Sequence, residues 1–435
     1  MTALSRRRFL AGAAGAALTV SGLDAIAARA GRAGAAELPV PGESGIDHVV
    51  VVMMENRSFD HLLGWLPEAD GRQAGLAYPD TSGKLVQTYP LAPDFTGCGF
   101  QDPDHSYEGG RVEFDAGRCD GWLRVNDVYS IGYYRRRDLA FFGQAAHDWT
   151  ACDRYFAAIL GPTFPNRIYQ HAGVTDRLSN TFALSTLPTI WDRLAQAGLQ
   201  GRYYYGNLPF VALWGAKYLP IARPFPSFLA DCASGNLPQV AYVDPTFTLQ
   251  GDEPGSNDDH PHADVRAGEA FLGRICDAVT SSPNWERTLL VVNFDEWGGF
   301  FDHVPPDNAP DVQPAFQRRG FRVPALLISP FAKRHHVSSQ VYDHTSVLRL
   351  IEWRWNLSPL SVRDATANNL ALALRLGKKP NPDAEPYVVP PFVSAGCTPP
   401  PPAAPAAAAP TTAASRADEW SGLAELARTH GYAVG

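Results

Sequence analysis

The sequence predicts a three-layer α/β/α sandwich built on a mostly parallel central sheet. Continuous apolar runs bounded by turn residues alternate with amphipathic patterns of helix length, which is the order of elements expected for this fold class. The runs are apolar throughout, as is typical of strands that are covered on both faces. With 435 residues, of which 45% are hydrophobic and 11% aromatic, the chain can bury a substantial core.

The expected elements follow in order between two unusual ends. The four predicted strands lie in residues 48–54 (HVVVVMM), 240–245 (VAYVDP), 288–299 (TLLVVNFDEWGG) and 323–331 (VPALLISPF). The four predicted helices lie in residues 138–156, 189–198, 264–282 and 344–355. Two long predicted loops, 66–133 and 245–263, are rich in glycine, proline, aspartate and aromatic residues. Loops of this length in a compact domain commonly carry function.

The first 36 residues predict an export signal. The stretch SRRRFL places Arg6 and Arg7 ahead of a mildly apolar, Ala/Gly-rich run, which resembles a twin-arginine signal. We therefore expect the twin-arginine export machinery as a partner, and a mature protein that is secreted or lies in the cell envelope. No later stretch reaches roughly 18 consecutive apolar residues, so the mature protein is expected to have no transmembrane helix.

The chain after the export signal divides into three predicted segments. A catalytic domain is expected over residues 37–395, followed by a Pro/Ala-rich linker over 396–415 that cannot bury a core. Residues 416–435 are expected to form a short helix or tail. We favour a segment that docks on the domain surface or frays over one that binds a partner. The apolar side chains that share one side of it are Trp420, Leu423 and Leu426.

The composition excludes two classes of protein. The formal net charge of −8 arises from intermixed acidic and basic residues, so no basic surface for nucleic acid is expected. The six cysteines contain no CxxC pair, which argues against a structural zinc ribbon. Disulfides are expected in an exported protein, and Cys98 and Cys119 lie closest in sequence, but the sequence leaves the pairing open.

Acidic residues follow two of the predicted strands directly. Glu55 and Asn56 come after the first strand, and Asp295 and Glu296 come after the run LLVVNF. Ligands of open parallel sheets bind at the carboxyl ends of the strands. Carboxylate and amide oxygens suit a hard divalent cation, so we expect one or more metal ions, with Ca²⁺, Mg²⁺ or Mn²⁺ favoured and Fe or Zn as alternatives. The competing interpretation is that these acids cap helices or face solvent.

The segment GPTFPNR contains a candidate nucleophile, Thr163. Two prolines fix its turn, and a helix is expected to begin near Asn166 or Arg167. The N–H groups at such a helix start favour an anion, so we expect Asn166 and Arg167 to bind a phosphate group. A threonine hydroxyl needs a base or a metal ion to become reactive. The competing interpretation is that Thr163 is a plain helix N-cap.

Histidines in polar loops are candidates for proton transfer. His105 and His260 lie in the two long loops, where an imidazole near neutral pH can protonate a departing oxygen. For His303 and His344 we favour supporting roles, in a turn and beside a helix cap formed by Asp343 or Thr345. Asp60 is likewise expected to support the turn that follows Glu55.

An aromatic stretch, residues 121–134, is a candidate for recognition of a quaternary ammonium group. Its aromatic residues are Trp122, Tyr129, Tyr133 and Tyr134. Their ring faces can attract such a cation. The alternative, that these rings belong to the core, carries equal weight from the sequence.

Five blocks together resemble the bacterial phosphoesterase family that contains phosphocholine-preferring phospholipases C and secreted acid phosphatases. They are MMENRSFDHLLG, DPDHSYEGG, GPTFPNR, DDHPHADV and FDEWGGFFDHVPPD. They span Ile46 to about Trp355 in the order of that family. The resemblance implies an alkaline-phosphatase-like core.

The resemblance also implies roles for individual residues. The positions that match those around the family's metal are Glu55, Asn56, Thr163, Asp295 and Glu296, with Thr163 as the nucleophile. His105 matches the histidine that protonates the leaving group, and His260 matches an active-site histidine. Where many relatives read Glu-His-Pro-Pro, this chain ends the block with His262, which is expected either to bind metal or to face solvent.

The sequence thus predicts a secreted, metal-dependent phosphoesterase with a threonine nucleophile. The favoured substrate is a phosphatidylcholine-like phosphodiester, which would require transient contact with a membrane surface. The first alternative is an acid phosphatase acting on small phosphomonoesters, because the chain lacks the long C-terminal modules of the larger phospholipases. The second alternative is an inactive family member that binds a surface.

Overall fold

The computed structural model describes residues 38–248, 254–397 and 413–435. The expected export signal, residues 1–36, and most of the expected linker therefore lie outside the described residues.

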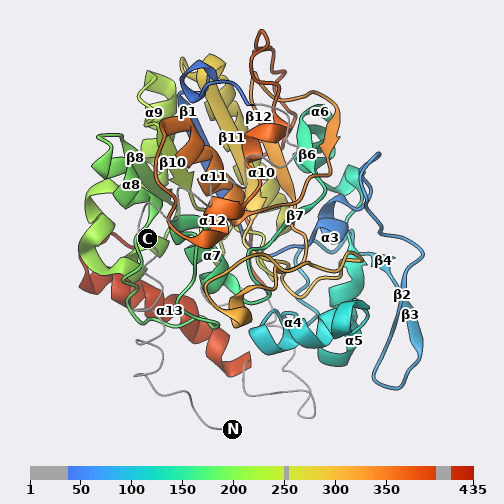
Figure 1. Ribbon diagram of the computed structural model, residues 1–435. Coiled ribbons are helices and arrows are strands. Elements are labelled where there is room, and N and C mark those ends of the chain that lie inside the picture. Colours follow the sequence, from blue (N-terminus) through green and yellow to red (C-terminus); the bar gives the residue numbers. More distant parts are fainter. Residues whose placement is uncertain (1–37, 249–253, 398–412) are drawn as a thin grey trace.

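An eight-stranded sheet forms the centre of the molecule (Figure 1). Its strand order is β13-β6-β12-β11-β1-β10-β8-β9. The bounds are β1 His48–Met54, β6 Thr150–Cys152, β8 Gly201–Tyr205, β9 Ala222–Pro224, β10 Val240–Val243, β11 Thr288–Phe294, β12 Ala325–Ile328 and β13 His336–Ser338. All pairings in this sheet are parallel except those of β12 with β11 and β6. The predicted mostly parallel sheet is confirmed.

One predicted strand runs against the others. The run at residues 323–331 forms β12, which is antiparallel to β11. A parallel neighbour requires a crossover that returns the chain to the other edge of the sheet. The segment between β11 and β12 contains only a short 3₁₀ helix, Pro314–Phe316, and makes no such crossover. β12 therefore starts beside the C-terminal end of β11 and runs in the opposite direction.

Helices cover both faces of the sheet, which confirms the three-layer sandwich. Neighbouring strand residues point to opposite faces. Asn293 therefore bonds to Gln170 of α7 (2.8 Å), whereas Phe294 packs on Phe142 of α6. In Figure 1, α11 lies in front of the sheet and α10 behind it. The longer helices of the two layers are α6 Phe142–Asp148, α7 Thr163–Ala172, α8 Ile190–Gln196, α9 Phe225–Ser234, α10 Val265–Thr280 and α11 His344–Trp355.

Shorter elements complete the fold, many of them within the long segment 66–133. They are α3 Phe59–Leu63, α4 Tyr107–Phe114, α5 Trp122–Val125, α12 Val362–Thr366, β2 Ala77–Pro79, β3 Leu85–Gln87, β4 Tyr89–Pro90, β5 Gly132–Tyr133, β7 Tyr155–Phe156 and β14 Tyr342–Asp343. This segment was expected to be a loop. Its small helices and strands pack around buried aromatic rings, which explains its aromatic content.

Three of the four predicted helices are confirmed by α8, α10 and α11, and the fourth is wrong in its second half. The helix predicted over 138–156 ends at Asp148, because Trp149 is extended and Thr150 enters β6. There β6 pairs with both β12 and β13. Pairing on two sides outweighs the local helical pattern, and a sequence pattern does not report it.

The C-terminal helix docks on the domain, as the sequence favoured. Helix α13, Ala413–Thr429, contacts the 3₁₀ segment Phe210–Ile221. Trp420 is 6% exposed and Leu423 is fully buried. This docking provides the apolar surface that a single short helix needs in order to be stable.

A disulfide joins Cys98 to Cys397, across a sequence separation of 299 residues. Cys119, the nearest cysteine in sequence to Cys98, is instead buried and free. The bond ties the start of the expected linker to a loop near the site described below.

Candidate active site

Two strand ends bring their acidic residues together. β1 and β11 are parallel neighbours with Met54 beside Phe294, and the Asp295 N–H donates to the Met54 carbonyl (3.0 Å). Glu55 and Asp295 therefore lie side by side, and both are fully buried. Burial, together with the charge of Asp295, raises the pKa of Glu55 well above its ordinary value. Burial also raises the pKa of Asp295 to about 7.

The expected substrate ligand Arg167 is instead a buried counter-ion. Its Nε donates to Glu55 Oε1 (3.1 Å) and Asp295 Oδ2 (3.2 Å), and Nη1 donates to Asp244 Oδ1 (3.1 Å). Nη2 donates to the carbonyls of Met53 and Met54. The side chain is 1% exposed. Because its donors are directed at the strand ends, the guanidinium partly offsets the charge of three carboxylates.

The second expected substrate ligand, Asn166, holds the turn before α7. Its Oδ1 accepts from Ile159 N (3.0 Å), and its Nδ2 donates to the carbonyls of Ile159, Gly161 and Pro162. The side chain is fully buried. These bonds direct it away from any ligand, so its role is to shape the segment that presents Thr163.

Thr163 is the first residue of α7, so the helix begins three or four residues before the expected start near Asn166 or Arg167. The N-cap residue is Pro162, which has no side-chain cap bond, and this excludes the N-cap interpretation of Thr163. The hydroxyl is directed at the acidic cluster instead, and Oγ1 donates to Glu55 Oε2 (3.4 Å). The position is 2% exposed.

The start of α7 offers fewer N–H groups to an anion than the sequence suggests. The Phe164 N–H donates to Asn180 Oδ1 (2.7 Å), and Pro165 has no N–H. Two of the first three helical residues are therefore not available as phosphate donors.

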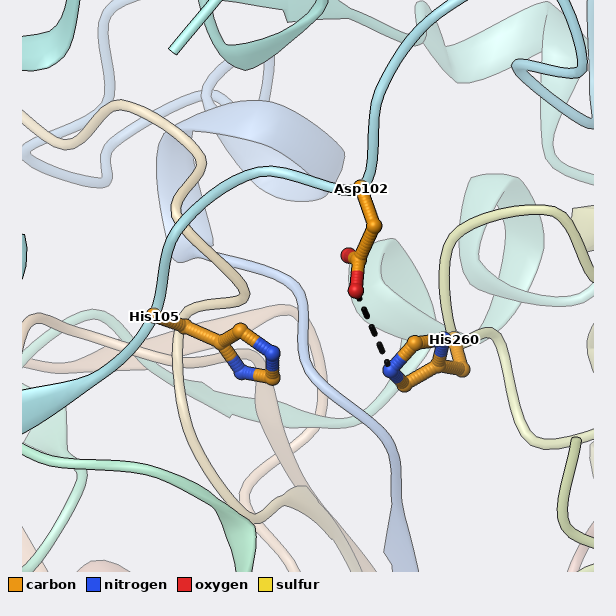
Figure 2. Close-up of side chains that lie close together, drawn as sticks. All are labelled: Asp102, His105 and His260. Atoms are coloured by element: carbon orange, nitrogen blue, oxygen red, sulfur yellow. Dashed lines mark ion pairs between the residues drawn. The ribbon is translucent and has the colours of Figure 1, made fainter. Parts of the chain in front are cut away.

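The two predicted histidines face each other from separate loops, below Asp102 (Figure 2). Their ring centroids are 5.9 Å apart. His105 Nδ1 contacts Glu296 Oε1 and lies 3.4 Å from Asn56 Nδ2. His260 Nε2 lies 4.0 Å from Asp102 Oδ2. Burial lowers the pKa of His260, although the Asp102 carboxylate acts in the opposite direction.

His344 supports the backbone at Asp295. Its Nε2 lies 2.6 Å from the Asp295 carbonyl, which it approaches as a donor. Burial lowers the pKa of His344 to about 4, so the ring is neutral near pH 7. The expected helix cap is also present, since Asp343 Oδ1 accepts from Thr345 N (3.0 Å).

The expected supporting residues Asp60 and His303 belong to one ion-pair network. Asp60 Oδ2 accepts from His303 Nδ1 (2.5 Å) and Oδ1 accepts from Arg322 Nη2 (3.1 Å). Arg322 also bonds to both oxygens of Asp302 (2.9 and 3.1 Å). The network joins α3, which follows Asn56, to the loop that follows Glu296.

The aromatic stretch does not face a ligand. Trp122 and Tyr134 are fully buried, and Tyr133 is 5% exposed. Trp122 Nε1 donates to the Cys119 carbonyl (2.7 Å) and Tyr134 Oη donates to the Asp94 carbonyl (2.9 Å). These rings are core residues, because burial against other side chains leaves no face for a cation.

His262 neither faces solvent nor lies among the predicted metal ligands. It is 4% exposed, and its Nε2 bonds to the Phe100 carbonyl (3.2 Å). It therefore fixes the loop that carries the disulfide.

Three acidic residues of the site were not predicted from the sequence. Asp244 directly follows β10, a buried strand, just as Glu55 follows β1, and it pairs with Arg167, so a signal for it was present in the sequence. Asp102 precedes His105 by three residues, but its approach to His260 depends on a different loop. The carbonyl of Asp258 accepts from Glu55 N (2.7 Å), a contact for which the sequence has no signal.

The predicted ligands fit a divalent cation. Asn56 Oδ1 is buried and has no hydrogen-bond partner, which is costly for a polar atom unless a ligand binds there. The same amide contacts Glu55 Oε2 (3.4 Å) and His105, which in turn contacts Glu296, and carboxylate and amide oxygens of this kind suit a hard cation. In the described part of the chain, Asp102, His105 and His260 also place ligand atoms within 4.8 Å of one another.

Comparison with known proteins identifies the family. Residues 46–358 match the Phosphoesterase family. The chain belongs to this family. It is therefore a hydrolase of phosphoric ester bonds, and this site at the sheet edge is its candidate active site.

Several relatives of the chain are phospholipases C by name. Non-specific phospholipase C1 of Arabidopsis thaliana is 29% identical over 391 residues, which cover 78% of this chain and 72% of that protein. Phospholipase C B of Mycobacterium tuberculosis is 29% identical over 469 residues, covering 87% of each chain. Non-hemolytic phospholipase C of Pseudomonas aeruginosa is also 29% identical, but only 58% of its length is covered.

The chain also matches solved structures, at much lower sequence identity. A protein of the alkaline phosphatase superfamily from Vibrio parahaemolyticus has a TM-score of 0.38 at 10% identity, covering 80% of this chain and 77% of that one. The lipoteichoic acid synthase LtaP from Listeria monocytogenes has a TM-score of 0.41 at 8% identity, covering 82% of each chain.

Among the described residues, no helix has both the length and the apolar content needed to cross a membrane.

Proposed function

We propose that this phosphoesterase is a metal-dependent phospholipase C that uses Thr163 as its nucleophile. The observation that carries the proposal is the placement of Thr163 Oγ1 beside Glu55 Oε2 (3.4 Å), next to the unpartnered Asn56 Oδ1. A hydroxyl in this position is held at the edge of an oxygen-rich cluster. The names of the relatives support a phospholipid substrate.

The reaction is a double displacement at phosphorus. Thr163 Oγ1 passes its proton to Glu55 Oε2, the acceptor of its hydrogen bond, and forms a bond to phosphorus while the bond from phosphorus to the alcohol oxygen breaks. This leaves a phosphothreonine. Water then attacks phosphorus and releases the phosphorylated head group, and the proton returns from Glu55 to Thr163 Oγ1, which restores the hydroxyl. A cation held by Glu55, Asn56, Asp295 and Glu296 would lower the pKa of the threonine hydroxyl and offset charge on the phosphate oxygens.

The histidines move the protons. His105 Nδ1 is held by Glu296, so its Nε2 is the atom that donates a proton to the departing alcohol. His260 Nδ1 bonds to the Pro261 carbonyl (3.0 Å), which leaves Nε2 as its acceptor. Because burial lowers its pKa, His260 is neutral near pH 7 and takes the proton of the attacking water.

The nucleophile is tested with Thr163→Ala and Thr163→Ser. Alanine removes the reacting oxygen, so hydrolysis of p-nitrophenyl phosphorylcholine should fall by about a thousandfold or more, while serine should keep measurable turnover. Metal content, measured by elemental analysis of protein purified without added metal, should stay comparable in both variants. Wild-type turnover in the alanine variant with the same metal content would exclude this mechanism.

Substrate preference has a runner-up, the phosphomonoesterase activity of an acid phosphatase. The burial of Trp122, Tyr133 and Tyr134 removes the aromatic basis for choline recognition and so favours this alternative relative to the sequence alone. Rates with p-nitrophenyl phosphate and with its phosphocholine ester, each with and without chelator, separate the two. Faster hydrolysis of the monoester would assign the phosphatase function.

We also propose that residues 1–36 export the folded protein and that 37–395 form its catalytic domain. The disulfide between Cys98 and Cys397 supports export, since such bonds persist in oxidising compartments. Replacing Arg6 and Arg7 by lysine should leave precursor in the cytoplasm, as immunoblots of cell fractions can show. Undiminished secretion would contradict the twin-arginine assignment.

A further inference from the structure

The C-terminal helix packs directly behind the candidate nucleophile. Trp420 of α13 stacks on Phe247, with ring centroids 4.2 Å apart and planes at 16°. The same indole meets Phe164 edge to face at 5.5 Å. Phe164 is the residue after Thr163. Figure 1 shows α13, in red, crossing below α7.

Phe247 links Trp420 to the charge cluster. The Arg167 guanidinium carbon lies 4.7 Å from the centroid of the Phe247 ring, on which Trp420 also stacks. Arg167 in turn bonds to Glu55 and Asp295. The chain of contacts therefore runs from the C-terminal helix through one aromatic ring to the strand ends.

The end of the chain strengthens the same contact. Asn207 brackets the Phe247 backbone, with Oδ1 accepting from its N–H (2.9 Å) and Nδ2 donating to its carbonyl (2.9 Å). The Asn207 carbonyl accepts from the N–H of Gly435 (3.0 Å). Trp420 and Gly435 lie outside the range that matches the family, 46–358, yet Trp420 contacts Phe164 and Phe247 directly and Gly435 bonds to Asn207.

We propose that Trp420 is a positioning residue for phosphate-ester hydrolysis, which holds Thr163 through Phe164 and Arg167 through Phe247. The inference rests on the proposed function of Thr163. One indole contacts both phenyl rings, and through them it sets where α7 begins and where the guanidinium lies. Small displacements of reacting groups cost large factors in rate, so loss of the indole acts on kcat rather than on KM.

The test compares Trp420 with Leu423, a buried residue of α13 that makes none of these ring contacts. Trp420→Ala and Trp420→Leu should lower kcat by about 10- to 100-fold with KM changed less than about threefold. Trp420→Phe keeps an aromatic face and should restore kcat to within about threefold of wild type. Leu423→Ala should lower the thermal midpoint but keep wild-type kcat, measured well below that midpoint.

The outcomes are distinguishable. Wild-type kcat in Trp420→Leu, or an equal loss in Leu423→Ala, would overturn the positioning role. If Trp420→Ala does not fold, the leucine variant keeps apolar bulk without an aromatic face and decides the question. Failure of the proposed function is a different result, namely wild-type turnover in Thr163→Ala whatever the Trp420 variants do.

Discussion

Two clusters of buried carboxylates lie near the carboxyl edge of the sheet, and they differ in how their oxygens are bonded. The active-site cluster consists of Glu55, Asn56, Arg167, Asp295 and Glu296. The clamp cluster consists of Asp60, Asp302, His303 and Arg322. Both sets were singled out in part from the sequence, because each follows a buried strand closely.

In the clamp cluster every carboxylate oxygen has a donor. Asp60 accepts from Arg72 N (2.9 Å) and His303 N (2.9 Å), besides the two charged partners described above. Asp302 accepts from Val304 N (2.9 Å) and from Arg322. Because every carboxylate oxygen of this cluster already accepts a hydrogen bond, a ligand would find no unpaired acceptor there. We therefore interpret the clamp cluster as structural.

In the active-site cluster the bonding is incomplete. The side-chain contacts of Glu55 Oε2, to Asn56 Nδ2 and Thr163 Oγ1, are both 3.4 Å long. Asn56 Oδ1 has no hydrogen-bond partner. Three carboxylates share Arg167, and burial keeps the pKa of both Glu55 and Asp295 high. The difference between the two clusters is therefore the completeness of their hydrogen bonding rather than the number of acids, and the incomplete bonding is what supports the proposal that the active-site cluster binds a cation.

The largest expected effect comes from Glu55→Gln. The amide keeps the shape but loses the charge that faces Thr163, so kcat should fall by about 100- to 1,000-fold. The free energy of unfolding should not fall, because a buried charge beside Asp295 is removed. Steady-state kinetics and urea unfolding measure both.

The matched control for this variant is Glu269→Gln. Glu269 is also a buried carboxyl, with its pKa raised to about 8 by burial, but it bonds to the N–H groups of Phe141 and Phe142, in the α6 layer. Its variant should keep kcat within about twofold of wild type, the ordinary result for a site that does not touch the substrate. An equal loss of kcat in Glu55→Gln and Glu269→Gln would show that the active-site cluster does not differ from other buried carboxyl groups in its effect on catalysis.

Arg322→Met should break the clamp cluster. It leaves Asp60 and Asp302 buried without their cation, which typically costs about 3 to 5 kcal/mol in free energy of unfolding. Urea unfolding followed by circular dichroism gives the value. A loss below about 1 kcal/mol would mean that the complete bonding of this cluster does not stabilise the fold.

The pH dependence of stability should expose the raised pKa of Asp295. The folded protein binds this proton more tightly than the unfolded chain, since the pKa rises from 3.8 to about 7. The associated stability is therefore complete below about pH 4 and is lost as pH rises through 7. The free energy of unfolding of Asp295→Asn should consequently rise relative to that of metal-free wild type as pH increases from 4 to 7, by up to about 3 kcal/mol. A pH-independent difference would contradict this.

The smallest effect is expected for the exposed ion pair between Arg154 and Asp70, next to the clamp cluster. Arg154 pairs with Asp70 at 3.0 Å, but the two side chains are 37% and 38% exposed. Exposed pairs contribute about 0 to 1 kcal/mol, so Arg154→Met should change the free energy of unfolding by less than about 1 kcal/mol. A loss as large as that of Arg322→Met would show that the network acts as one unit.

The sequence predicted the layers and most long elements because they depend on local periodicity. Helices α8, α10 and α11 and the central strands were identified in this way. The second half of 138–156 was not, because β6 exists only through pairing with β12 and β13. The aromatic stretch was undecided for a related reason, since an exposed ring and a core ring have the same sequence pattern.

By itself, the sequence determined which residues stand at the strand ends, since a buried run fixes the direction and end of a strand. It therefore supplied Glu55, Asn56, Asp295 and Glu296 and placed Thr163 just ahead of a helix, whereas the helix begins at Thr163 itself. Only the tertiary structure decided what surrounds them. Arg167 became a counter-ion, Asp102 and Asp244 joined the site, and Trp420 came to lie behind Thr163. Contacts between residues far apart in the chain depend on how the layers pack, and no local pattern encodes that packing.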